Sequence, residues 1–110
     1  MVQMTAQTQA VLAVFLSDLS QRRYGLEITK EARLSSGTIY PLLARLESAG
    51  WIESEWEDID PAIEGRRPRR YYRLTGEGET AASAALQRTI ERLAPALRIN
   101  AGAAIYGAQP

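Results

Sequence analysis

The apolar residues in the first half of the chain recur with the period of an α-helix. Between residues 5 and 20 they follow the i, i+3, i+4, i+7 spacing of one helical face, which predicts a first helix. The apolar residues of this face are Leu12, Phe15, Leu16 and Leu19. A short second helix is expected over 26–32 and a third over 38–49. Pro41 lies in the early turns of the third helix, so it either sets the helix start or leaves a local irregularity.

After residue 50 the period changes to two. Over 51–58 glutamates alternate with apolar or small residues, which is typical of a strand with one wet face and one buried face. The alternation returns over 69–74, after a loop that contains two prolines and a glycine. The two runs predict an antiparallel hairpin with a long tip. We expect Trp51 and Trp56 to belong to the hydrophobic core at its base.

A long final helix is expected to begin after Thr75, which can cap it, and to end near residue 100. Its apolar stripe has the 4-3-4 spacing of a coiled-coil seam. The residues of this stripe are Leu86, Ile90, Leu93 and Leu97. Nothing else in the chain is left to cover the stripe fully, so these residues are expected to form a homodimer interface. Pro95 should kink or weaken the helix.

Three helices followed by a hairpin predict a winged helix-turn-helix, in which the third helix lies in the major groove of DNA. The fold class is therefore mostly α with a small β-hairpin and a long C-terminal dimerisation helix. We expect a DNA-binding domain over 5–75, a dimerisation helix over 76–100, and a disordered tail over 101–110, which is rich in alanine and glycine.

The amino-acid composition excludes several kinds of functional site. The 110 residues suit one domain, and the chain contains neither cysteine nor histidine. That removes disulfides, thiolate or imidazole metal ligands and a Ser-His triad. We expect no enzyme activity, no metal and no cofactor. No apolar run approaches the roughly 20 residues of a membrane span, so a cytoplasmic protein without membrane contact is expected.

The charges are balanced overall but not locally, since Lys+Arg and Asp+Glu number 13 each. Six acids over 51–64 are followed by five arginines over 65–74. Arg69 and Arg73 are expected to lie opposite the strand glutamates Glu53, Glu55 or Glu57 and to pair with them across the hairpin. Arg66 and Arg67 at the tip have no such assigned partner, and we expect them to contact the DNA backbone or minor groove. Arg69 is a candidate for either role.

Several short motifs follow one another in a particular order and spacing. They are Tyr24-Gly25 with Glu27-Ile28, the run SGTIYPLL over 36–43, Arg45-Leu46-Glu47 with Gly50, and YYRLT over 71–75 with Gly78. Together these motifs resemble the PadR family of bacterial transcriptional regulators. The resemblance covers about residues 5–100 and points to the shorter subgroup with a single C-terminal helix. It implies a homodimer that binds a palindromic DNA operator, usually as a repressor, and that is often released by a small-molecule effector.

Some short members of that family stack flat compounds on an aromatic residue of the last helix. Here no aromatic residue lies between Thr75 and Ala104, so the identity and existence of an effector stay open.

The start of the third helix supplies the other candidate DNA contacts. Ser35, Ser36, Thr38 and Tyr40 could simply be a helix cap beside a half-buried aromatic. Their place at the start of a recognition helix favours base contacts for Thr38 and Tyr40, and capping with a phosphate contact for Ser36. The candidate DNA-binding residues are Ser35, Ser36, Thr38, Tyr40, Arg45, Arg66, Arg67 and Arg69.

The alternative interpretation is a winged-helix protein–protein interaction module that uses the acidic hairpin as its contact surface.

Overall fold

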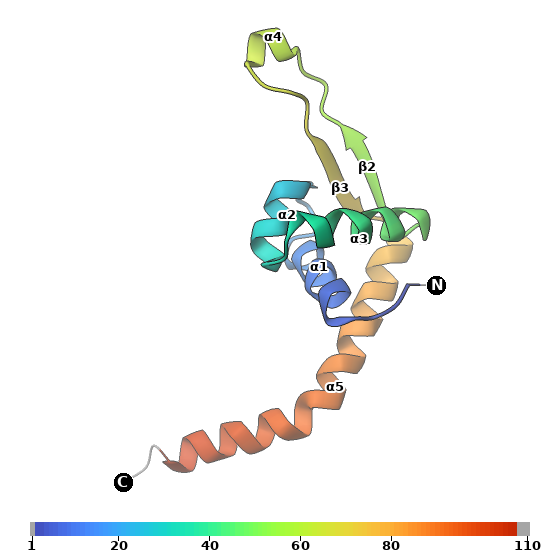
Figure 1. Cartoon of the computed structure of the whole chain (residues 1–110). Helices are drawn as coiled ribbons and strands as arrows, with labels where there is room; N and C mark the ends of the chain where they lie inside the picture. The colour runs from blue at the N-terminus through green and yellow to red at the C-terminus, as the bar shows by residue number, and fades with distance from the viewer. Residues whose placement is uncertain (1, 108–110) are drawn as a thin grey trace.

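A helical body carries a projecting hairpin at one end and a long C-terminal helix at the other (Figure 1). This computed structural model describes the backbone of residues 2–107 and the side chains of residues 2–96. The elements, in chain order, are α1 (Ala6–Ser17), β1 (Arg23–Tyr24), α2 (Gly25–Ala32), α3 (Ser36–Ser48), β2 (Ile52–Trp56), α4 (Pro61–Glu64), β3 (Arg70–Leu74) and α5 (Gly76–Gly107).

The helix starts follow from local capping. Thr5 caps α1, because its hydroxyl accepts a hydrogen bond from the backbone N–H of Thr8 at 3.1 Å. The third helix begins at Ser36, two residues before the expected start, and it continues through Pro41. The carbonyl that Pro41 leaves unpaired belongs to Gly37 in the exposed first turn, where water can serve it.

The sheet has three strands rather than the two of the predicted hairpin, in the order β1-β3-β2, all antiparallel. The missed strand is β1, where Arg23 pairs with Tyr72 and Tyr24 with Tyr71. Two residues are too few to show a period of two, so the sequence around Arg23 predicts only a connection. The predicted class, mostly helical with a small sheet and a long C-terminal helix, is confirmed.

The core lies where α1, α2, α3 and the base of the sheet meet. Its buried residues are Val11, Leu12, Val14, Phe15, Ile28, Ile39, Leu42, Leu43, Leu46, Ile52, Tyr72 and Ala82. Two expected core residues lie outside it. Leu19 follows the end of α1 and is 49% exposed, and Trp56 is 65% exposed. Trp51 is half-buried against the core, as expected.

The wing and the last helix share one tight junction. The Thr75 hydroxyl donates to the carbonyl of Gly50 at 2.6 Å and accepts from the N–H of Gly78 at 3.0 Å. Gly78 is buried, and a Cβ atom there would overlap the carbonyl oxygen of Trp51. This contact fixes where α5 leaves the sheet.

Helix α5 runs longer than expected, past Pro95 to Gly107. The expected tail over 101–110 therefore differs from the structure over 101–107, where three of the residues are alanines with the highest helix propensity. Residues 108–110 lie outside the described part of the chain.

Candidate nucleic-acid interface

The first turn of α3 carries a cluster of hydroxyl groups. Ser35 and Ser36 are exposed, and Thr38 is partly exposed. The N-cap is Ser35, not Ser36 as expected, and its hydroxyl lies 3.1 Å from that of Thr38 instead of bonding to a backbone N–H. Backbone N–H groups at the start of a helix attract anions, so this turn can receive a phosphate oxygen.

Tyr40 and Arg45 point away from the core in two directions. The ring of Tyr40 is 49% exposed and passes over Gly25 at the start of α2. Arg45 is exposed and lies seven residues after Thr38, on the same face of α3. Within residues 2–96 no ion pair involves Arg45, so its guanidinium remains available to a phosphate or a base.

Arg66 has a partner, contrary to the sequence prediction. Its guanidinium donates to both carboxylate oxygens of Glu57, at 2.6 and 3.0 Å. The short helix α4 is capped by Gly65, whose left-handed φ of 69° turns the chain back toward Glu57, the residue after β2. The Arg66 guanidinium lowers the pKa of Glu57 from 4.5 to about 2.

Arg67 fits its predicted role as an unpaired tip residue. It is exposed, and the side chains of residues 2–96 include no ion-pair partner for it. Arg66 and Arg67 are therefore unequal, because a phosphate must compete with Glu57 for Arg66 but not for Arg67.

The outer face of the hairpin is a lattice of ion pairs. Glu53 pairs with Arg73 at 2.7 Å, which confirms that cross-strand prediction, and Glu55 pairs with Arg22. Arg69 does not join this lattice. Its guanidinium carbon lies 4.4 Å from the ring centre of Tyr24, a cation–π contact.

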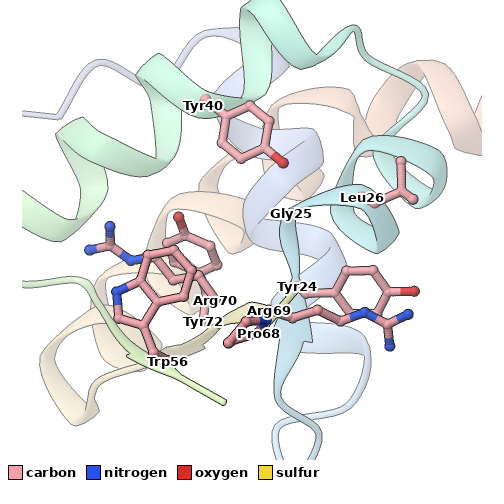
Figure 2. Close-up of a pocket in the computed structure, with 9 residues that line it drawn as sticks. All are labelled: Tyr24, Gly25, Leu26, Tyr40, Trp56, Pro68, Arg69, Arg70 and Tyr72. Atoms are coloured by element: carbon pink, nitrogen blue, oxygen red, sulfur yellow. The ribbon is translucent and has the colours of Figure 1, made fainter. Parts of the chain in front are cut away.

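A concave site separates α3 from the inner face of the hairpin (Figure 2). Its volume is about 500 Å³. We call it the aromatic pocket, and its lining residues are Tyr24, Gly25, Leu26, Tyr40, Trp56, Pro68, Arg69, Arg70 and Tyr72. It brings two predicted site residues, Tyr40 and Arg69, to one place.

Arg70 links the wing to α3. Its Nε donates to the Ser54 hydroxyl at 2.9 Å, and its Nη2 donates to Glu47 of α3 at 3.1 Å. The Ser54 hydroxyl in turn donates to Glu47 at 2.5 Å. This network holds the wing at a set angle to the helix. Arg70 and Trp56 were not among the predicted site residues. They pair with each other across the hairpin at a position beyond Ser54 and Tyr72, and this position is the signal that could have found them.

The predicted dimerisation stripe on α5 is largely uncovered. Leu86 is partly buried, while Ile90 and Leu93 are 54% and 47% exposed. The side chain of Leu97 lies outside the described residues. Thr89, at the edge of this stripe, donates to the Gln9 side chain of α1 at 2.9 Å. The helix is thus anchored to the body and leaves an apolar face open.

The described part of the chain holds no group of three acidic side chains that could bind a metal ion. None of its helices combines the length and apolar character needed to cross a bilayer.

Comparison with known families identifies the class. A family model, the transcriptional regulator PadR-like family, matches residues 11–84. The chain belongs to the PadR-like family. The match spans α2, α3 and the whole hairpin, so it includes the elements that carry the candidate interface. PadR-like proteins are transcriptional regulators rather than enzymes.

Solved structures of PadR-like and related regulators resemble this fold. A PadR family regulator from Clostridium difficile is 27% identical, with a TM-score of 0.65, over 84% of this chain and 98% of that one. One from Eggerthella lenta is 28% identical, with a TM-score of 0.56, over 91% and 84%. No curated protein matches the chain.

A variant of ZitR from Lactococcus lactis shares the fold at 16% identity and a TM-score of 0.68. The alignment covers 89% of this chain but spans only 61% of the ZitR chain.

Proposed function

We propose that this PadR-like protein is a homodimeric, sequence-specific DNA-binding regulator that represses transcription from a palindromic operator. The observation that carries the proposal is the exposed first half of α3, whose Tyr40 faces the hairpin across one concave surface. A recognition helix beside a wing is the arrangement with which winged helix-turn-helix proteins grip a duplex.

The proposed contacts divide into two kinds. Thr38 and Tyr40 would meet base edges in the major groove, where the four base pairs can be distinguished. The remaining candidates would meet phosphates or the minor groove and position the protein without reading sequence. These are Ser35, Ser36, Arg45, Arg66, Arg67 and Arg69.

The proposed dimer uses α5. Ile90 and Leu93 are apolar and about half exposed on a long helix that is anchored to its own body as far along as Thr89, near its midpoint. Packing of such a face against a second copy removes it from water and stabilises the helix. We propose Leu86, Ile90, Leu93 and Leu97 as the seam.

The protein–protein interaction module is less well supported. Its contact surface would be the acidic hairpin, but Glu53, Glu55 and Glu57 are all occupied by arginines of the same chain. A surface that neutralises its own acids offers little net charge to a basic partner.

The test separates reading of sequence from holding of the backbone. Arg67→Ala should lower the slope of log affinity against log salt by about one and weaken all sequences alike. Tyr40→Ala should keep that slope and cost roughly 1–3 kcal/mol on the operator while sparing random DNA. Mobility shifts over a salt series, with DNA from upstream of the protein's own gene, measure both quantities.

Matched controls make the test specific. Arg88→Ala removes an exposed arginine from α5, far from the proposed interface, and should change neither slope nor specificity. Tyr40→Phe keeps the ring and separates its hydroxyl from its packing. Loss of specificity in Arg67→Ala with only a slope change in Tyr40→Ala would overturn this docking. No effect in either variant would favour the interaction module.

A further inference from the structure

The aromatic pocket has the walls of a stacking site. Tyr40 of α3 lies on one side, and Trp56 and Tyr72 of the hairpin lie on the opposite side (Figure 2). Trp56 is 65% exposed and is not part of the core. Exposed aromatic rings on two facing elements provide a surface for a planar ring.

The pocket also selects for negative charge. None of its nine lining residues is acidic, and two are arginines. The strand glutamates Glu53 and Glu55 lie on the outer face of the hairpin, where they pair with Arg73 and Arg22. Arg70 is held by Glu47, whereas no carboxylate within residues 2–96 forms an ion pair with Arg69. Arg69 is therefore the lining arginine without an ion-pair partner in the described part of the chain; its guanidinium lies over the Tyr24 ring, and its backbone N–H donates to Glu57 at 3.3 Å.

The volume of the aromatic pocket limits the size of the ligand. A volume of about 500 Å³ lies in the usual range for small-molecule sites, roughly 300–1,000 Å³. A single ring with one carboxylate would leave most of it empty, whereas a base, a sugar and a phosphate together would occupy it. Tyr40 and Tyr72 line the same site, and a phenol group can donate to or accept from the edge of a base.

We propose that the aromatic pocket binds a nucleotide, with the base against Trp56 and Tyr40 and the phosphate on Arg69. The nucleotide can come from two sources, a free mononucleotide or an unpaired nucleotide of a DNA strand. Resting on the proposed function, we infer in addition that a free nucleotide competes with the operator, because it engages the same Tyr40 that would read the major groove. The pocket would then act as the effector site that α5, with no aromatic residue between Thr75 and Ala104, does not offer.

Tryptophan emission of the full-length protein measures the binding directly, without any DNA. Titration with AMP should quench emission saturably, and Trp56→Phe should abolish the response while the emission of Trp51 remains. Adenosine, which lacks the phosphate, should bind about tenfold more weakly, as expected for loss of one charge-assisted contact. Quenching by AMP that persists in Trp56→Phe, or no quenching by either AMP or a six-nucleotide single strand, would overturn the site.

Arg69→Gln tests the phosphate contact. It should weaken AMP about tenfold and leave adenosine unchanged. The matched control is Arg73→Gln, because Arg73 pairs with Glu53 on the outer face of the hairpin and does not line the pocket. Circular dichroism checks that both variants fold. Equal loss of AMP and adenosine binding in Arg69→Gln, or equal loss of AMP binding in both variants, would refute the phosphate assignment.

Further experiments identify the source of the nucleotide and test whether its binding competes with operator binding. Quenching by a six-nucleotide single strand without quenching by AMP would assign the pocket to DNA and overturn the free-nucleotide effector. Benzoate that quenches where AMP and the oligonucleotide do not would overturn the ligand class. Mobility shifts with and without saturating AMP test competition. Operator binding that AMP leaves unchanged, in a protein shown to bind both, would overturn the coupling but not the pocket or the regulator function.

Discussion

The ring of Tyr40 occupies the space that a side chain on Gly25 would need. A Cβ atom at Gly25 would lie 2.5 Å from the Tyr40 hydroxyl oxygen and 2.7 Å from Cε1 of its ring. The φ of Gly25 is not in the left-handed region, so the reason for glycine here is steric. The first residue of α2 thereby sets the direction of the aromatic side chain on α3.

Gly25→Ala should therefore alter DNA reading more than folding. The flexible Tyr40 side chain can swing into solvent to make room for the new methyl group, so the midpoint of thermal unfolding should move little. Operator specificity should fall toward that of Tyr40→Ala, a loss of roughly 1–3 kcal/mol, while binding to random DNA stays the same. Mobility shifts on both DNAs measure this; unchanged specificity would show that the position of Tyr40 does not matter for readout.

Gly78→Ala should have the opposite profile. Its methyl group would overlap the backbone carbonyl of Trp51, which cannot move without disrupting the junction of β2 and α5. We expect a loss of about 2–4 kcal/mol in the free energy of unfolding, measured in urea. Gly76→Ala is the control, since nothing lies within 4 Å of a Cβ atom there. Similar stabilities for the two variants would contradict the close contact.

The helical part of this fold could be predicted because apolar spacing at 3.6 residues survives in the sequence of α1, α3 and α5. The strand β1 could not, since two residues carry no period. Trp56 was misplaced because alternation shows which face a residue occupies but not how far the core extends along that face. The core ends at Tyr72, two cross-strand pairs before Trp56.

The site was predicted in part for a similar reason. Hydroxyl groups at the start of a recognition helix are visible in the sequence. The partner of Arg66 is not, because the αL turn at Gly65 and the helix α4 bring Glu57 back to it from nine residues away. The aromatic pocket needs three elements that are distant in the chain, and no local pattern reports their meeting.

Glu57→Gln should strengthen DNA binding. The carboxylate holds Arg66 in a bidentate pair, and its neutral replacement leaves that guanidinium available to a phosphate. We expect nonspecific affinity at low salt to rise and the salt slope to steepen by about one. Glu53→Gln serves as the control, because it frees Arg73 on the outer face of the hairpin instead. An equal gain in the control would mean that only net charge matters.

The same pair predicts an acid transition. Because the pKa of Glu57 falls from 4.5 to about 2 on folding, the ionised carboxylate stabilises the folded state above pH 4.5. That contribution should disappear as the pH falls from about 4.5 to about 2. The difference in urea midpoint between the wild type and Glu57→Gln should be constant above pH 5 and shrink across this window. A difference that grows with acidification would contradict the pairing.

Leu93→Asp should separate the subunits. The substitution places a charge in the proposed α5 seam, which costs several kcal/mol if it stays unpaired. We expect a monomer by sedimentation and loss of operator binding in the same variant, with an intact helical circular dichroism spectrum. Arg92→Asp, at the neighbouring exposed position, is the control and should remain dimeric. A Leu93→Asp protein that stays dimeric and binds operator would place the interface elsewhere.

Thr75 couples the wing rigidly to α5. Its hydroxyl is hydrogen-bonded both to Gly50 and to the first turn of the helix, so the wing and α5 are expected to move together as one rigid body. Each residue of an α-helix adds about 1.5 Å and about 100°. In the proposed dimer, the number of residues between Thr75 and the seam therefore sets the distance between the two wings and their rotation about the helix axis. The spacing of the operator half-sites would then be determined by the length of this helix and not by any residue that contacts DNA.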